Sequence, residues 1–268
     1  MRRQEFRAVE PVRPAAGYIG GKRNLAGRLI ERIEAIPHDG YAEAFVGMGG
    51  VFLRRRSAPP FEAINDASGD VANFFRILQR HYTHFLEMLR FQVASRREFE
   101  RLIKTDPDTL TDLERAARFL YLQRMAFGGK VTGRTFGVSK VGGARFNVTT
   151  LAPTLEAIHE RLAGVVIERL PWQDFLKRYD RPGMLFYLDP PYFGNEGDYG
   201  RDAFGRDEFA EMAERLAALK GTFLLSINDR PEVRETFGAF EIEPVRTTYS
   251  IADGRPMSAG ELIIRKRD

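Results

Sequence analysis

The sequence of 268 residues has no cysteine, which excludes disulfide bonds, thiolate metal sites, iron–sulfur clusters and a cysteine nucleophile. No apolar stretch approaches the roughly 18 residues that a membrane span needs. The charged start, MRRQEFRAVEPVRP, has no apolar core of a secretory signal. The four histidines offer little for a metal site. We therefore expect no metal, no membrane partner and a cytoplasmic location.

Positive charge is concentrated in the middle of the chain. The formal net charge is only +4, but residues 76–146 hold 14 basic and 7 acidic residues, whereas residues 147–268 hold 16 and 21. A basic middle of this kind indicates a polyanionic partner such as a nucleic acid. Residues 128–146 interleave glycines, basic residues, Phe136 and Phe146. This composition predicts a flexible basic hairpin or loop that enters a nucleic-acid groove or wedges between bases.

Strands and helices alternate at both ends of the chain. Predicted strands cover 41–47, 61–66, 165–171, 184–192 and 222–229, predicted helices cover 22–36, 67–105, 112–126, 150–163 and 207–219, and residues 240–251 and 261–267 form a closing antiparallel pair. A further helix begins after residue 48. The pattern predicts an α/β fold with an open sheet, built from residues 1–75 and 160–268. Residues 76–159 form a mostly helical, basic insertion.

A glycine-containing turn follows the first predicted strand. Residues 43–50 read EAFVGMGG, and Asp66 ends the next strand, 19 residues after Gly47. Glycines allow a ligand to approach the backbone, and an acid at this position accepts hydrogen bonds from ribose hydroxyls. The pair predicts a nucleoside-containing cofactor in a Rossmann-like fold. The glycine pattern is not the full G-x-G-x-x-G, which disfavours a dinucleotide.

A second group of functional residues ends a buried strand. Asp189, Pro190, Pro191 and Tyr192 stand where the strand ends of an open α/β sheet line the ligand crevice. An acid, a carbonyl held in place by proline and an aromatic ring suit a planar substrate with an amino group. Asp189 and the Pro190 carbonyl can accept the amino hydrogens, and Tyr192 can stack on the ring. A third segment, Tyr18 to Lys22 (YIGGK), precedes the first helix.

In order and spacing, these segments make the chain resemble the Dam-like alpha group of DNA N6-adenine methyltransferases. That group has an aromatic-x-G-G-K segment, an E-P-F-x-G-x-G turn, an acid after the next strand, a DNA-recognition insertion and D-P-P-Y. Tyr18 replaces the usual tryptophan, and Ala44 replaces the proline of the turn. The resemblance implies a Rossmann-like class I methyltransferase sheet that binds S-adenosylmethionine, and an insertion, residues 76–159, that reads double-stranded DNA.

The resemblance also implies roles for individual residues. The catalytic residues are Asp189, Pro190 and Tyr192. The cofactor contacts are Tyr18, Lys22, Phe45, Gly47, Asp66, Asp174, Phe175 and Asp189. From the basic segment we expect DNA contacts at Arg124, Lys130, Arg134, Lys140 and Arg145.

Several alternatives stay open. An RNA adenine methyltransferase would use the same Asp-Pro-Pro-Tyr chemistry, and relatives of the motif act on a glutamine amide. A catalytically decayed DNA-binding protein would keep the scaffold without the reaction, and a nicotinamide dehydrogenase leaves Asp-Pro-Pro-Tyr unexplained. Residues 193–206 form either a lid or a plain surface loop. Because no dimer interface is evident, we expect a monomer that associates with the nucleoid through DNA.

Overall fold

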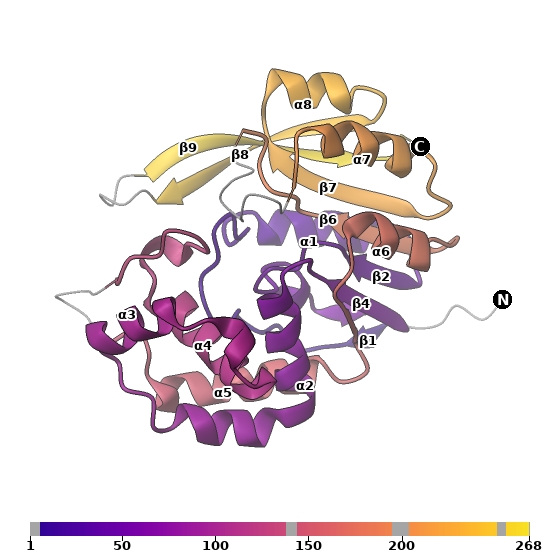
Figure 1. Ribbon diagram of the computed structural model, residues 1–268. Helices are drawn as coiled ribbons and strands as arrows, with labels where there is room; N and C mark the ends of the chain where they lie inside the picture. The colour runs from indigo at the N-terminus through magenta and orange to yellow at the C-terminus, as the bar shows by residue number, and fades with distance from the viewer. Residues whose placement is uncertain (1–5, 138–143, 195–203, 251–255, 268) are drawn as a thin grey trace.

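The computed structural model describes residues 6–137, 144–194, 204–250 and 256–267 (Figure 1). One sheet has the strand order β5 (Val166–Glu168), β4 (Phe61–Asn65), β2 (Gly40–Glu43), β6 (Met184–Leu188), β7 (Thr222–Asn228), β9 (Pro256–Arg265) and β8 (Glu241–Ser250). Neighbouring strands from β5 to β7 are parallel, and the β8–β9 pair closes the edge with antiparallel pairing. Short strands β1 (Arg7–Ala8) and β3 (Ser57–Ala58) pair separately. The predicted α/β class and the closing antiparallel pair are confirmed.

Helices cover both faces of the sheet. One face carries α1 (Ala26–Ala35), and the other carries α6 (Trp172–Tyr179), α7 (Asp207–Ala217) and α8 (Pro231–Thr236). The alternation within β2 shows how: Tyr41 packs in one apolar cluster with Leu29 of α1, and Ala42 packs in the other with Phe175 of α6. A parallel sheet buried on both faces explains why the central strand β6, MLFYL, is a continuous apolar run in the sequence.

The segment between β4 and β5 is helical. It contains α2 (Gly69–Leu89), α3 (Arg96–Lys104), the 3₁₀ turn η2 (Pro107–Thr109), α4 (Asp112–Met125), the 3₁₀ turn η3 (Phe127–Gly129) and α5 (Val148–Arg161), which group beside the sheet in Figure 1. The prediction of one helix over 67–105 is wrong. The helix ends at Leu89, and the hydroxyl of Ser95 accepts a hydrogen bond from the Glu98 amide to start a new one.

A second prediction also fails. The helix expected after residue 48 is only the 3₁₀ turn η1 (Phe52–Arg54). Its first residue, Phe52, is fully buried in the core that the sheet shares with α2. The apolar residues that look like a helical start therefore serve to pack a tight turn under the sheet.

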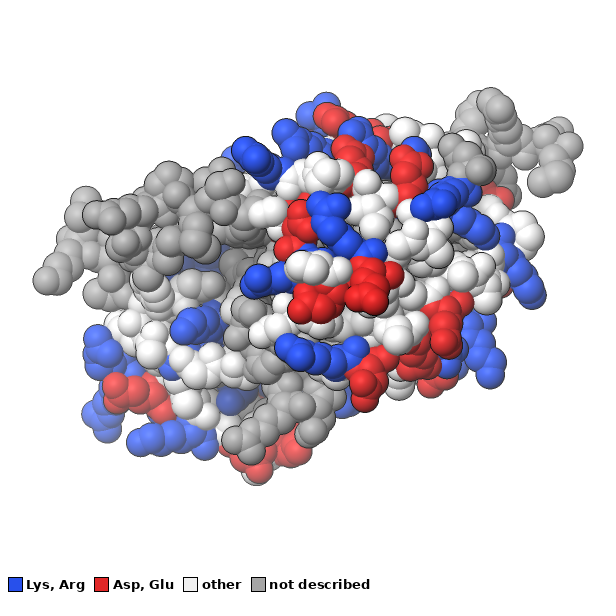
Figure 2. All heavy atoms as spheres, turned by 90° about the horizontal axis from the view of Figure 1, so that it is seen from above, with Lys and Arg blue, Asp and Glu red and all other residues white. Residues whose placement is uncertain are grey.

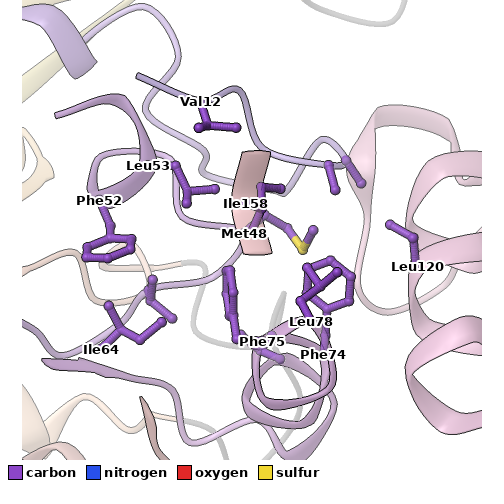
Figure 3. Packing of buried hydrophobic residues seen from close by; sticks show 14 of the residues in the cluster. Val12, Met48, Phe52, Leu53, Ile64, Phe74, Phe75, Leu78, Leu120 and Ile158 are labelled. Carbon is purple, nitrogen blue, oxygen red and sulfur yellow. The ribbon is translucent and has the colours of Figure 1, made fainter. Parts of the chain in front are cut away.

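The helical segment and the sheet share one core. Met48 and Ile64 belong to the same apolar cluster as Phe75 of α2, Leu120 of α4 and Ile158 of α5 (Figure 3). The expected boundary at residue 76 falls inside α2, one residue after Phe75. The shared helix and core hold the basic middle of the chain in a defined position relative to the sheet.

Candidate active site

A large pocket opens at the carboxyl ends of β2, β4 and β6. It has a volume of about 1120 Å³ and is lined by six of the residues that the sequence singles out: Tyr18, Lys22, Phe45, Gly47, Asp66 and Asp189. Strand β2 lies between β4 and β6. From β2 the chain continues to β4 and β5 on one side, and it later returns to β6 on the other side, so the strand order reverses at β2. Ligands of open α/β sheets bind in the crevice at such a position. Parallel pairing thus brings motifs from distant parts of the chain to one site.

The glycine turn is held by Asp66. One carboxylate oxygen of Asp66 accepts a hydrogen bond from the Gly47 amide and the other from the Ser68 amide, both at 2.9 Å. Gly47 has a φ of +50°, and a Cβ on it would lie 3.0 Å from the ring of Tyr18. Only glycine therefore fits beneath this ring without strain. Burial raises the pKa of Asp66 to about 6, against the lowering effect of the two amides.

Asp189 is held directly by Lys22 and Ser226, and Tyr187 in turn contacts Ser226. Its Oδ1 atom lies 2.8 Å from the Lys22 ammonium and accepts a hydrogen bond from the Ser226 hydroxyl at 3.1 Å. The Tyr187 hydroxyl lies 2.8 Å from the Ser226 oxygen. Because the single Ser226 proton is donated to Asp189, Tyr187 is the donor to Ser226. Within the described chain both contacts use Oδ1, which leaves Oδ2 for a substrate.

The charge of Asp189 reflects two opposed effects. Burial raises its pKa to about 6, and the nearby Lys22 cation acts in the opposite direction. Asp189 is therefore mostly a carboxylate at neutral pH. Glu43, which also lines the pocket, behaves differently: burial raises its pKa to about 8, although the Tyr41 hydroxyl donates to it at 2.7 Å. Of these two carboxyl groups in the pocket wall, Asp189 therefore carries the negative charge at neutral pH and Glu43 is mostly protonated.

Three important residues were missed by the motif analysis. Ser226 and Asn228 lie at the end of β7, and Glu261 lies opposite Asn228 on β9. The Asn228 side chain bonds both the amide and the carbonyl of Phe193, which fixes the chain just after the Asp-Pro-Pro-Tyr segment. Glu261 accepts a hydrogen bond from the Tyr192 hydroxyl. The one available signal was the polar end, SIND, of an otherwise apolar strand.

Tyr192 contacts the buried Lys22 side chain. Its hydroxyl accepts a hydrogen bond from the Lys22 ammonium at 2.8 Å, and the same ammonium lies 4.3 Å from the centre of the Tyr192 ring. Pro191 lines the pocket, whereas Pro190 is buried and neither it nor Tyr192 is among the residues that line it. In this arrangement Tyr192 supports Lys22 directly.

The structure places two expected cofactor contacts elsewhere. Asp174 is exposed on α6, and Phe175 is fully buried in the apolar cluster under that helix. Neither side chain lines the pocket. Phe175 packs edge-on against Tyr179 at 5.1 Å, as its helical spacing on an amphipathic helix requires. These two residues are not brought together with the other predicted cofactor contacts.

The described part of the glycine-rich segment forms a short antiparallel loop. Its base is closed by hydrogen bonds from the Phe127 amide to the Thr135 carbonyl and from the Gly137 amide to the Met125 carbonyl. Lys130 and Arg145 are exposed on it. Lys140, the fifth expected DNA contact, and residues 195–203 of the possible lid lie outside the described residues.

Three of the expected DNA contacts make hydrogen bonds within the protein, and Arg145 donates one of them to the Ala126 carbonyl at 3.4 Å. Arg124 bonds the carbonyls of Ala15 and Arg145, and Arg134 bonds the Gln123 side chain and the Lys130 carbonyl. Burial lowers the pKa of both Arg124 and Arg134. These bonds join the base of the loop to α4 and to the chain just before Tyr18.

The two phenylalanines of this segment do not act as free wedges. Phe146 is buried against Tyr121 at 5.1 Å, so its expected role as a wedge between bases is wrong. Phe136 is half-buried and packs against Phe99 at 5.4 Å. The exposed aromatic side chain at this end of the described loop is Phe127.

The pocket carries unbalanced positive charge on one side. Arg13, Arg23 and Arg54 line it, and burial together with repulsion from Arg23 and Arg13 lowers the pKa of Arg54. Among the described residues no carboxylate forms an ion pair with these three arginines. The face over the C-terminal strands is different, because acidic and basic side chains are mixed there (Figure 2). A polyanion is thus attracted to the pocket side of the molecule.

The sequence is similar to those of known methyltransferases. The family model for D12 class N6 adenine-specific DNA methyltransferase matches residues 18–251. A type II methyltransferase of Lactococcus lactis subsp. cremoris is 25% identical over 255 residues, covering 88% of each chain. A type II methyltransferase of Paramecium bursaria Chlorella virus NC1A is 20% identical over 85% of this chain and 88% of its own. The DNA N-6-adenine-methyltransferase of Escherichia phage P1 is 26% identical over 78% of this chain and 29% of its own length.

Two further features of the described residues concern a membrane and a metal ion. The described residues contain no helix long and apolar enough to cross a membrane. They also contain no group of three or more His, Asp or Glu side chains that could hold a metal ion.

Proposed function

This chain belongs to the D12 class N6 adenine-specific DNA methyltransferase family, and we propose that its pocket binds S-adenosylmethionine next to an adenine flipped out of duplex DNA. Membership makes the chain an enzyme that methylates adenine in DNA, as its motifs indicate. The observation that carries the proposal is the convergence of Tyr18, Lys22, Gly47, Asp66 and Asp189 on one pocket. We assign cofactor binding to the first four residues and the target amino group to Asp189.

The pocket is suited to this cofactor. Small-molecule pockets usually measure roughly 300–1000 Å³, so about 1120 Å³ has room for a nucleoside cofactor and a second base. Asp66 is largely anionic at neutral pH and can accept hydrogen bonds from ribose hydroxyls. The absent Cβ of Gly47 lets the Tyr18 ring pack closely on the turn. Bound S-adenosylmethionine supplies the methyl group of the reaction.

Asp189 prepares the adenine for methylation. Its Oδ2 atom and the Pro190 carbonyl accept the two hydrogens of the N6 amino group. As N6 bonds to the methyl group, the bond between that methyl group and the cofactor sulfur breaks; N6 carries positive charge and then releases one hydrogen to solvent as a proton. The carboxylate stabilises that charge, and the Lys22 and Ser226 contacts hold it in place. Positioning and electrostatics supply most of the acceleration, because the reactive group comes from the cofactor.

We assign DNA binding to the inserted residues 76–159 and to the pocket rim. Lys130 and Arg145 are exposed on the glycine-rich loop, and both can contact phosphates. Phe127, 39% exposed at the start of that loop, is the aromatic side chain available to occupy the space left by a flipped base. The loop is tied to residues just before Tyr18, so DNA bound to it lies close to the pocket.

Expression in cells that lack adenine methylation tests the proposal. Long-read sequencing of their DNA should show modified adenines within one short motif for the wild type and none for Asp189→Ala. Asp39→Ala, which removes a carboxylate that is 47% exposed at the amino end of β2, away from the pocket, should methylate as the wild type does. If the wild type leaves DNA unmodified but the purified protein binds S-adenosylmethionine, the substrate is RNA or protein. If it does not bind S-adenosylmethionine either, the chain is a decayed DNA-binding scaffold.

A further inference from the structure

Glu261 is a buried carboxylate that belongs to none of the sequence motifs. It lies on β9 with 1% of its surface exposed, and it pairs in register with Asn228 at the end of β7. Its Oε1 atom accepts the hydrogen bond of the Tyr192 hydroxyl, and its Oε2 atom lies 3.5 Å from the Lys22 ammonium. A residue near the end of the chain thus reaches the Asp-Pro-Pro-Tyr segment.

The Glu261 carboxylate changes the balance of charge around Lys22. Lys22 is also buried, and its ammonium faces two carboxylates, Asp189 at 2.8 Å and Glu261 at 3.5 Å. Lys22 and Asp189 alone would form a neutral pair, and the cation would withdraw electron density from the acceptor of the amino group. With Glu261 the group carries one net negative charge. Glu261 shares the field of Lys22 and leaves Asp189 a stronger acceptor.

Glu261 also fixes the position of the Tyr192 hydroxyl. The Tyr192 hydroxyl is held between the Lys22 ammonium, which donates to it, and Glu261, which accepts from it. The Lys22 ammonium also lies over the Tyr192 ring. Tyr192 is only three residues from Asp189, so this anchor limits movement of the whole Asp-Pro-Pro-Tyr segment. Removing the carboxylate would release the tyrosine and one side of the lysine together.

We propose that Glu261 is a positioning residue for methyl transfer, which holds Lys22 and Tyr192 so that the Asp189 carboxylate faces the target amino group. This inference rests on the proposed function of the same pocket. Glu261 touches neither base nor cofactor in this assignment and acts through Lys22 and Tyr192. Loss of Glu261 should therefore lower the rate of the chemical step more than it weakens the binding of either substrate.

The test compares Glu261→Gln with Glu241→Gln, which makes the same change in the exposed ion pair with Arg265 on the β8–β9 pair. Steady-state methylation of duplex DNA measures kcat and the KM of each substrate. A charged hydrogen bond is worth about 1.5–3 kcal/mol, so kcat for Glu261→Gln should fall at least about tenfold. The KM for DNA should stay within about twofold of the wild type, and the KM for S-adenosylmethionine should change less than kcat, because Lys22 keeps its contact with Asp189. Glu241→Gln should match the wild type.

The pH profile separates positioning from a general structural defect. The charged groups around Asp189 are Lys22, Glu261 and Glu43, with Tyr187 and the Ser226 hydroxyl also in contact or nearby. Repulsion by Glu261 raises the pKa of Asp189, so removing the charge lowers it. The acid limb of kcat should therefore move to lower pH in Glu261→Gln and stay in place in Glu241→Gln.

Two results would overturn the inference: a wild-type kcat with an unmoved acid limb, or a change confined to KM. If Glu261→Gln does not fold, Tyr192→Phe replaces it, since this change removes the hydroxyl that Lys22 and Glu261 share. It should also lower kcat with little effect on KM, and a wild-type kcat would contradict the proposal. Should the wild-type enzyme methylate no adenine, the proposed function fails instead.

Discussion

Replacing Ser226 with alanine separates the catalytic and structural parts of the Asp189 environment. Ser226 is fully buried, and its hydroxyl joins the Tyr187 hydroxyl at 2.8 Å to Asp189 at 3.1 Å. The substitution removes a hydrogen bond to a carboxylate, worth about 1.5–3 kcal/mol. It also leaves the buried Tyr187 hydroxyl without its partner, which costs about 1–3 kcal/mol of folding free energy.

Both effects can be measured on one set of proteins. If the lost bond acts fully in the transition state, single-turnover methyl transfer should slow by roughly 10- to 150-fold. Urea unfolding should show the loss of stability independently. Adding Tyr187→Phe to the Ser226→Ala variant removes the orphaned hydroxyl, so stability should recover while the rate stays low.

The recovery pattern decides the case. A double variant that regains rate as well as stability would show that Ser226→Ala acts only by disturbing the fold. A Ser226→Ala enzyme with the wild-type rate would refute the assignment of Ser226 as support for Asp189. Tyr187→Phe alone provides the remaining corner of the cycle, and it should keep most of the rate because Ser226 still donates to Asp189.

Three further predictions concern charge. Asp66→Asn should raise the KM for S-adenosylmethionine with little change in kcat. Calorimetry should show that the affinity of the wild type for S-adenosylmethionine falls below pH 6, where the Asp66 carboxylate gains a proton, whereas the affinity of the variant does not change with pH. Glu43 has a folded pKa of about 8 against an ordinary value of 4.5, so the unfolded chain loses this proton first as pH rises. The free energy of unfolding of the wild type, measured in urea, should therefore fall relative to that of Glu43→Gln by up to about 1.4 kcal/mol per pH unit between these two pKa values. A difference in this free energy that stays constant with pH would contradict a buried neutral Glu43. Lys130→Gln and Arg145→Gln should each flatten the slope of log affinity for DNA against log salt by about 0.9, and an unchanged slope would remove both from the phosphate contacts.

Much of the catalytic end of the sheet follows from local sequence. MLFYL before Asp189 is an apolar run, and FEAIN before Asp66 is rich in apolar residues; each segment is followed by an acid and forms a buried parallel strand. Since parallel strands end on the same edge of a sheet, the two acids meet although 123 positions separate them in the chain. The family was likewise evident from the order of the motifs alone.

Contacts within the protein could not be predicted in the same way, because composition does not reveal which neighbours a side chain meets. Phe146 stands in a basic, glycine-rich segment that is typical of an exposed loop, yet it packs on Tyr121 of α4. Arg124 and Arg134 look like phosphate contacts by charge, yet they bond carbonyl and amide oxygens of this chain. Burial and hydrogen bonding of Phe146, Arg124 and Arg134 depend on the position of α4 in the folded protein, and the residues next to each side chain in the sequence do not determine that position.

The sequence by itself therefore determined the α/β class, the family and the residues at the strand ends, because apolar periodicity and turn chemistry act over a few neighbouring residues. Only the tertiary structure decided that Ser226 and Glu261 complete the surroundings of Asp189 and Lys22, because each contact joins positions far apart in the chain. Tertiary structure also decided that Glu43 is neutral where Asp189 is charged. The pKa of a carboxyl depends on its burial and on the charges around it, and both arise only when the strands assemble.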